Sequence, residues 1–121
     1  MVKGIGTDII EIERIRQSIK KHGQHFLDTI FTPQEQAYCK KHKDPTPHYA
    51  GRFAAKEAII KSLGAGFGEG YTWLDMEIEN NPKGQPRAHF SENLNQLFDS
   101  PKILLSISHC KAYAVATAVW I

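Results

Sequence analysis

Glu57 and Lys61 are the residues in this chain whose types and spacing most clearly indicate chemistry. They lie four residues apart in the segment 51–64, GRFAAKEAIIKSLG, and on a helix this spacing places both side chains on one face. A carboxylate there can bind a metal ion, and an ammonium group can bind phosphate. Alone, such a pair is more often a solvated surface pair, by roughly ten to one. Asp8, in the apolar segment 5–10, and the run 106–109, SISH, at the end of a late strand change these odds, and together with Glu57 and Lys61 they indicate a site for a metal and a phosphate ester.

Asp8 has two interpretations from the sequence. An aspartate near the end of an apolar strand is costly to bury unless it binds a cation or hydrogen-bond donors, but it can also cap a helix that follows. Together with Glu57 it would supply the usual protein share of a magnesium site, which is one or two carboxylates beside waters and substrate phosphate oxygens. Lys61 would then neutralise phosphate charge, with Arg52 or Lys56 adding contacts from the adjoining helix face.

Size and composition limit the possible classes of protein. With 121 residues the chain is predicted to be a single domain, 1–121, too short for a separate cofactor domain, which favours a site between subunits of a homo-oligomer. A net charge of +2 argues against a dedicated nucleic-acid-binding protein, and no stretch approaches the roughly 20 apolar residues of a membrane span. Cys39 and Cys110 lack metal-ligand spacing and are interpreted as reduced thiols. We therefore expect a soluble cytoplasmic protein.

The elements that must position these residues follow from hydrophobic periodicity and capping signals. Asp8 falls near the end of a β-branched strand, and Thr32-Pro33 with Glu35 forms a capping box that starts a helix. In chain order, the first half is predicted to contain a strand at 2–10, a helix from 11 that Gly23 ends, a short apolar piece at 26–31, helices at 33–42 and 47–63, and a glycine-rich loop at 64–70.

The second half of the chain has mainly strand patterns. The predicted elements are strands at 73–79 and 86–90 joined by a turn, a short helix at 91–98, and an apolar hairpin of strands at 103–109 and 113–121. In the last strand Ala114, Ala116 and Ala118 share one face, and these small side chains allow a helix to lie close, most simply the one that carries Glu57. The predicted fold class is α+β, with a mainly antiparallel sheet packed against helices.

Five sequence blocks carry a resemblance to a known family. They are Gly4-Ile5-Gly6-Thr7-Asp8-Ile9-Ile10-Glu11-Ile12 with Arg14-Ile15, Phe31-Thr32 with Glu35 and Tyr38-Cys39, Arg52-Phe53-Ala54-Ala55-Lys56-Glu57-Ala58 with Lys61 and Gly64, Gly84-Gln85-Pro86, and Ser106-Ile107-Ser108-His109 with Tyr113-Ala114. In this order, and over practically the whole chain, the sequence resembles the holo-acyl-carrier-protein synthases. These are the small bacterial type of 4'-phosphopantetheinyl transferase.

The resemblance implies a fold, an assembly and a reaction. The 4'-phosphopantetheinyl transferase fold would form a homotrimer with each coenzyme A site between neighbouring subunits. Mg²⁺ held by Asp8 and Glu57 would grip the coenzyme A diphosphate. A serine hydroxyl of an apo acyl carrier protein would attack the β-phosphate and release adenosine 3',5'-bisphosphate, as a step of fatty acid biosynthesis.

The resemblance also implies roles for individual residues. Asp8, Glu57 and Lys61 would be catalytic, with Asp8 and Glu57 as metal ligands and Lys61 on phosphate. Five residues lie in blocks that line the coenzyme, in addition to Lys61: Arg52, Gly64, Pro86, Ser108 and His109. Arg14, Lys20 and Lys21 would contact an acidic carrier protein. The preferred general base is Glu57 acting through a metal-bound water, and Lys61 is the alternative.

Two other functions compete with transfer. A metal-dependent diphosphate-ester hydrolase would use the same carboxylates and lysine to direct water at the same bond, although a basic carrier-docking helix would then have no purpose. A non-enzymatic oligomeric binding module would need only that Asp8 caps a helix and that Glu57 pairs with Lys61.

Overall fold

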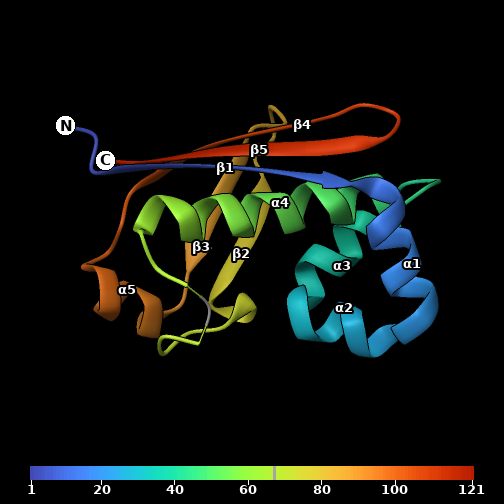
Figure 1. Ribbon diagram of the computed structural model, residues 1–121, viewed down its shortest axis with the longest axis horizontal. Coiled ribbons are helices and arrows are strands. Elements are labelled where there is room, and N and C mark those ends of the chain that lie inside the picture. The colour runs from blue at the N-terminus through green and yellow to red at the C-terminus, as the bar shows by residue number, and fades with distance from the viewer. Residues whose placement is uncertain (67) are drawn as a thin grey trace.

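The computed structural model describes residues 1–66 and 68–121 and shows strands interleaved with helices (Figure 1). The elements are β1 (Gly4–Glu11), α1 (Ile12–His22), α2 (Gln24–Ile30), α3 (Pro33–Lys40), α4 (Thr46–Leu63), a 3-10 turn η1 (Trp73–Asp75), β2 (Met76–Asn80), β3 (Pro86–Phe90), α5 (Glu92–Phe98), β4 (Ile103–His109) and β5 (Tyr113–Trp120). In the part of the chain that the structure describes, no helix combines the length and apolar character needed to cross a membrane.

The strands form two antiparallel sheets. One sheet has the order β1-β5-β4, and the other is the hairpin β2-β3. The long helix α4 packs along the three-stranded sheet, while α1, α2 and α3 gather at the right-hand end of the molecule in Figure 1. The α+β prediction is confirmed, with the antiparallel strands divided between two sheets.

Small residues allow α4 to lie against the three-stranded sheet. Ala114, Ala116 and Ala118 of β5 are buried in that interface, as predicted from the alanine face. On β1, a Cβ atom added to Gly4 would collide with the carbonyl oxygen of Ser62, and one added to Gly6 with that of Ala58. Because both glycines lack a side chain, β1 packs directly on the α4 backbone. This contact brings Asp8 to the helix face that carries Lys61.

A buried ion pair joins α4 to the other half of the fold. Lys56 is fully buried, and its Nζ donates to Glu35 Oε1 at 2.7 Å and to the Ile30 carbonyl at 2.7 Å. Glu35 Oε2 accepts from the backbone N–H of Ile78 at 2.7 Å. The pair therefore connects α2, α3 and β2 to α4. The expectation that Lys56 would contact phosphate is wrong, because its charge is used inside the core.

Several element boundaries differ from the prediction. β1 begins at Gly4, two residues later than expected, and the apolar piece at 26–31 belongs to the helix α2 up to Ile30, with Phe31 as its C-cap. Gly23, at φ 59°, allows the chain to turn between α1 and α2. The segment Trp73–Asp75 is a 3-10 turn rather than strand, because Asp75 accepts a hydrogen bond from the Thr72 N–H in a capping box.

The helix α3 begins as predicted and ends earlier. Thr32 Oγ1 accepts from the Glu35 N–H and Glu35 Oε1 accepts from the Thr32 N–H, so the capping box is present. At the other end, the Lys41 N–H bonds to the Tyr38 carbonyl and the His42 N–H to the Cys39 carbonyl. These bonds reach back three residues rather than four, and regular helix therefore stops at Lys40 instead of residue 42.

Candidate functional site

Asp8 and Lys61 form one part of the candidate site. Lys61 Nζ donates to Asp8 Oδ1 at 3.1 Å and to the Thr7 carbonyl at 3.0 Å, and its side chain is 53% exposed against 15% for Asp8. The N-cap residue of α1 is Glu11, without a side-chain capping bond. The interpretation of Asp8 as a helix cap is therefore wrong. The pairing of Glu57 with Lys61 that the binding-module alternative needs is also wrong, because Lys61 pairs with Asp8.

Glu57 completes an acidic cluster, defined here as Asp8, Glu57 and Lys61. Glu57 is half-buried one turn before Lys61 on α4. Burial raises the pKa of the Glu57 carboxyl, the negative charge of Asp8 raises it further, and Lys61 opposes both effects. Two carboxylates that repel each other this way fit a hard divalent cation that takes oxygen ligands. Among the described residues no group of three or more His, Cys, Asp or Glu side chains forms a metal site, so further ligands would come from water and substrate.

Arg52 lies in a second part of the candidate site, a pocket of about 170 Å³ that we call the Arg52 pocket. It is lined by Tyr38, Pro47, His48, Gly51, Arg52, Asn80, Gly84, Pro86, Ile107 and His109. Three predicted coenzyme residues, Arg52, Pro86 and His109, are thus brought together from α4, β3 and β4.

Arg52 is a buried cation without an anionic partner. The residue is 4% exposed, one terminal nitrogen donates to Asn80 Oδ1 at 2.7 Å, and the guanidinium carbon lies 4.0 Å from the centre of the Tyr38 ring. Over residues 1–66 and 68–121, no carboxylate forms an ion pair with it and its Nε has no hydrogen-bond partner. A buried, uncompensated guanidinium is costly, and an anionic ligand would relieve that cost.

The acidic cluster and the Arg52 pocket face different directions. Arg52 and Lys61 are nine residues apart on α4, which is two and a half helical turns, so they lie on opposite faces and about 13 Å apart along the axis. The two edges of the three-stranded sheet show the same separation, since Asp8 lies on β1 and His109 on β4. The prediction that Arg52 adds contacts from a face adjoining Lys61 is therefore wrong.

Two predicted coenzyme residues lie outside the Arg52 pocket. Gly64 caps the end of α4 at φ 71° and is exposed. Ser108 shares the outer face of the three-stranded sheet with Val115, its register partner, whereas Ile107 faces the pocket. Sequence reasoning missed Asn80, which holds Arg52, because the side chain sits in a predicted turn and nothing in the local pattern marks its long-range bond.

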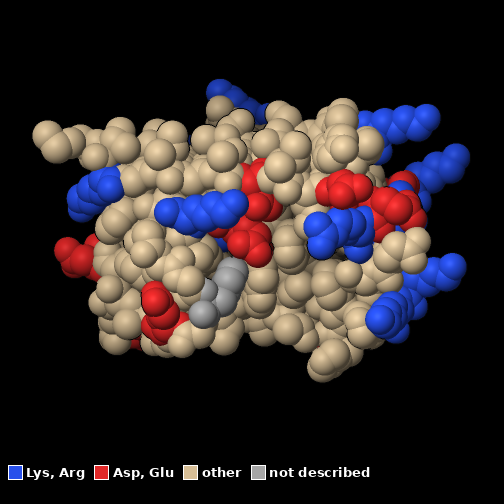
Figure 2. All heavy atoms as spheres, viewed as in Figure 1, with Lys and Arg blue, Asp and Glu red and all other residues tan. Residues whose placement is uncertain are grey.

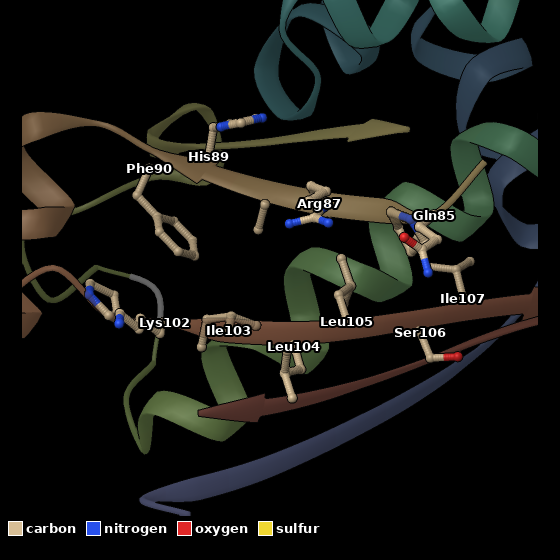
Figure 3. A pocket seen from close by; sticks show the side chains of 13 residues that line it. Gln85, Arg87, His89, Phe90, Lys102, Ile103, Leu104, Leu105, Ser106 and Ile107 are labelled. Carbon is tan, nitrogen blue, oxygen red and sulfur yellow. The ribbon is translucent and has the colours of Figure 1, made fainter. Parts of the chain in front are cut away.

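A larger groove of about 660 Å³ runs between β3 and β4 and shares Pro86 and Ile107 with the Arg52 pocket. Figure 3 shows Phe90 on the β3 side and Leu105 and Ile107 on the β4 side directed into this space, whereas His89 and Leu104 point away. The β2-β3 hairpin and the three-stranded sheet are therefore splayed at this edge, and the groove continues the Arg52 pocket along the strands.

The basic residues of α1 do not form one patch. Arg14, Lys20 and Lys21 are all exposed, and Figure 2 shows Lys and Arg side chains projecting at the end of the molecule that carries α1. Arg14 and Lys21 are seven residues apart and share a face, but Lys20 lies closer to the face of Arg16. Arg16 is occupied by ion pairs with Glu13 and Asp44.

Comparison with known proteins identifies the family. Residues 4–118 match the model of the 4'-phosphopantetheinyl transferase superfamily. The chain belongs to this superfamily. The match spans β1 to β5, so it includes the acidic cluster, the Arg52 pocket and the groove, and it confirms the predicted enzyme class.

Curated relatives and solved structures agree over the full length. A Holo-[acyl-carrier-protein] synthase of Protochlamydia amoebophila is 59% identical over 120 residues, which cover 99% of this chain and 98% of that protein. The Helicobacter pylori holo-[acyl-carrier-protein] synthase, solved in complex with coenzyme A, is 35% identical with a TM-score of 0.88, covering 97% of this chain and 99% of that one. The Neisseria meningitidis enzyme has a TM-score of 0.92 at 32% identity, covering 100% and 99%. The predicted transferase family and fold are confirmed.

Proposed function

We propose that this protein transfers the 4'-phosphopantetheine group from coenzyme A to a serine of an apo acyl carrier protein in the presence of Mg²⁺. The observation that carries the proposal is the acidic cluster, in which β1 sets Asp8 against the helix face of Glu57 and Lys61. Relatives with the name Holo-[acyl-carrier-protein] synthase support the choice of acceptor.

Each member of the acidic cluster has a role in the proposed reaction. Asp8 and Glu57 would hold the metal, which when bound neutralises diphosphate charge. Lys61, whose ammonium group is half-exposed, would bind a diphosphate oxygen. The serine oxygen forms a bond to the β-phosphorus, the bond between the two phosphates breaks, and adenosine 3',5'-bisphosphate leaves with the electron pair. Glu57 is our assignment for the group that accepts the serine proton, because burial and the charge of Asp8 raise the pKa of its carboxyl and so make it a stronger base.

The Arg52 pocket is proposed to hold the nucleotide end of the coenzyme. Its buried guanidinium has no carboxylate partner in the described part of the chain, and the 3'-phosphate and the diphosphate of coenzyme A are anionic groups of suitable charge. One chain presents the acidic cluster and this pocket on opposite faces of α4, so we propose that a complete site combines the acidic cluster of one subunit with the Arg52 pocket of a neighbour.

The proposed assembly is a homotrimer. The outer face of the β1-β5-β4 sheet is apolar and uncovered, with Ile5 67%, Ile9 64% and Leu104 59% exposed. An apolar sheet face of this kind is typical of an interface between subunits. Burial of that face among three copies would bring neighbouring chains together, as the divided site requires.

The carrier and the cellular setting complete the proposal. Arg14 and Lys21 share an exposed face of α1 and would contact an acidic carrier, with Lys20 at the margin. A role in fatty acid biosynthesis follows from an acyl carrier protein as acceptor. A cytoplasmic location is supported by two free cysteines, Cys39 and Cys110.

Intact-mass spectrometry of an apo acyl carrier protein, incubated with this protein, coenzyme A and Mg²⁺, tests the function. We expect a mass gain equal to phosphopantetheine, lost when EDTA is added and lost with a carrier whose acceptor serine is alanine. Release of adenosine 3',5'-bisphosphate without a mass gain would instead indicate the hydrolase. If neither the mass gain nor the release occurred, the result would contradict both the transferase and the hydrolase.

A further inference from the structure

Three imidazole rings, His42, His48 and His109, cluster at the Arg52 pocket, and two of them, His42 and His48, have no role in the function proposed above. The His42 and His48 rings stack with centroids 3.5 Å apart and planes 22° apart, and the His109 ring meets His48 edge-on at 5.7 Å. His48 precedes Arg52 by four residues on α4, so both side chains lie on one helix face and both line the pocket. His109 closes the pocket from β4.

His42 fixes the orientation of this stack. Its Nδ1 lies 3.1 Å from the Tyr38 carbonyl oxygen, which can only accept, so Nδ1 carries a proton and donates. The Tyr38 ring packs against both imidazoles, at 5.0 Å from His42 and 6.1 Å from His48. His48 is therefore held between a supporting ring and the pocket, and it is half-buried there.

Most of the charged or titratable groups around His48 oppose a positive charge on it. Arg52 on α4, His42 after α3 and His109 on β4 all oppose a positive charge on it, and Asp44, before α4, is the favourable neighbour. Asp44 is already bonded to Arg16 by both carboxylate oxygens, and Lys41 adds a further positive charge over the Tyr38 ring. Burial first, and then these neighbours, lower the pKa of His48 to about 4. Without a ligand the imidazole is neutral at physiological pH.

We propose that His48, supported by His42, is a further ligand-binding residue of this pocket, and that it takes up a proton when a phosphate group of the coenzyme binds beside Arg52. The inference rests on the proposed function, because it takes the nucleotide end of coenzyme A as the ligand. A phosphate dianion next to His48 reverses the local charge and favours the imidazolium form. His42 supports the ring from behind, since the two imidazoles stack with centroids 3.5 Å apart.

Proton uptake on binding makes affinity depend on pH. Suppose that the anion raises the pKa of His48 by about two units from its value of about 4. The contribution of His48 then makes coenzyme affinity about fourfold higher at pH 5.5 than at pH 8. The gain disappears at high pH, where His48 is neutral in both states. Phosphate monoesters also titrate near pH 6, so a variant without the imidazole must be compared with the wild-type protein.

Isothermal titration calorimetry with coenzyme A at pH 5.5 and pH 8, in two buffers of different ionisation enthalpy, measures both affinity and protons taken up. The test variant is His48→Phe, which keeps a ring against His42, and the matched control is His25→Phe, at an exposed histidine of α2. We expect wild type and His25→Phe to take up several tenths of a proton more than His48→Phe at pH 5.5. The fourfold affinity difference should be confined to that pH.

Normal coenzyme binding by His48→Phe with unchanged proton uptake would overturn this inference alone. Absence of coenzyme binding by the wild-type chain would overturn the proposed function and this inference with it. An NMR titration of the His48 ring in the unmodified protein provides a measurement that does not depend on a variant folding. Its pKa of about 4 should rise on addition of coenzyme A, and an unchanged value would contradict the proposal.

Discussion

The acidic cluster and the Arg52 pocket are opposite in charge and in accessibility. The acidic cluster has two carboxylates, and its lysine is half-exposed and already paired with Asp8. The Arg52 pocket has a buried guanidinium with no carboxylate partner in the described residues, and beside it burial and neighbouring groups lower the pKa of His48 to about 4. Each region lacks what the other supplies, yet α4 holds them on opposite faces. The comparison shows that one chain holds both sets of groups but on opposite faces of α4, and this separation is the reason for proposing a site shared between subunits.

A subunit-mixing experiment gives the largest expected effect. Asp8→Asn removes one carboxylate and Arg52→Ala removes the buried cation, and each should lower transferase activity by about 10² to 10³-fold. In a trimer mixed from equal amounts of the two variants, about a quarter of the sites combine an intact acidic cluster with an intact pocket. Activity in an assay of phosphopantetheine transfer should therefore recover to about that fraction. No recovery, in mixtures shown to have exchanged subunits, would mean that each site belongs to one chain.

The buried ion pair that joins the two halves of the fold gives the next largest effect. Lys56→Ala leaves Glu35 charged and unpaired in the core, and should lower the free energy of unfolding by about 3 to 5 kcal/mol, measured by urea denaturation. Lys83→Ala, at an exposed position in the β2-β3 turn, is the matched control and should change it by less than about 0.5 kcal/mol. Equal stabilities would show that the pair does not hold α4 in place.

Charge reversal on α1 should affect the carrier and not the coenzyme. Arg14→Glu with Lys21→Glu changes the shared exposed face, and KM for the acyl carrier protein should rise about tenfold at low salt while KM for coenzyme A stays the same. Lys20→Glu should have a smaller effect because Lys20 lies towards Arg16. Equal effects of all three changes on both substrates would contradict a carrier surface on this face.

His48 gives the smallest predicted effect, on stability against pH. Because burial and neighbouring positive charge lower the pKa of His48 to about 4, from about 6.5 in the unfolded chain, the unfolded state binds more protons between these values. The free energy of unfolding should therefore fall as pH falls from about 6.5 to about 4. His48→Phe should lose stability less steeply over this interval in urea melts, and parallel curves would exclude His48 as a cause.

Local patterns predicted most of the elements. The capping box at Thr32 and Glu35, the long helix that carries Glu57 and the alanine face of β5 all follow from interactions within a few residues or from strand alternation. Trp73 was incorrectly assigned to a strand, and the apolar piece at 26–31 was given no secondary structure. Apolar residues suit a strand, a helix or a turn, and only the Thr72 capping box and Gly23 decide between them.

The sequence could predict which residues belong to the candidate site, but not how they are arranged in space. Spacing alone placed Glu57 and Lys61 on one face and indicated Arg52 as a phosphate contact, and the resemblance supplied His109 and the coenzyme as the ligand of both Arg52 and His109. The sequence could not show that Lys56 forms an ion pair with Glu35, or that the Arg52 pocket lies away from Lys61. Both depend on contacts between segments far apart in the sequence. His48 has no local signal, because its properties arise from burial and from four charged or titratable neighbours, His42, His109, Arg52 and Asp44, that the fold places around it.

Gly4 and Gly6 limit which amino-acid substitutions this protein can tolerate. Neither residue has a functional group, yet a single methyl group at either position would strike the backbone of α4, a partner that cannot rotate away. Displacement of β1 would carry Asp8 away from Lys61. In a deep mutational scan for activity, we therefore expect substitutions of these two glycines to be as harmful as substitutions of Asp8 and Glu57. The most severe losses should fall at the contact between the β1 and α4 backbones as well as at the acidic cluster that this contact positions.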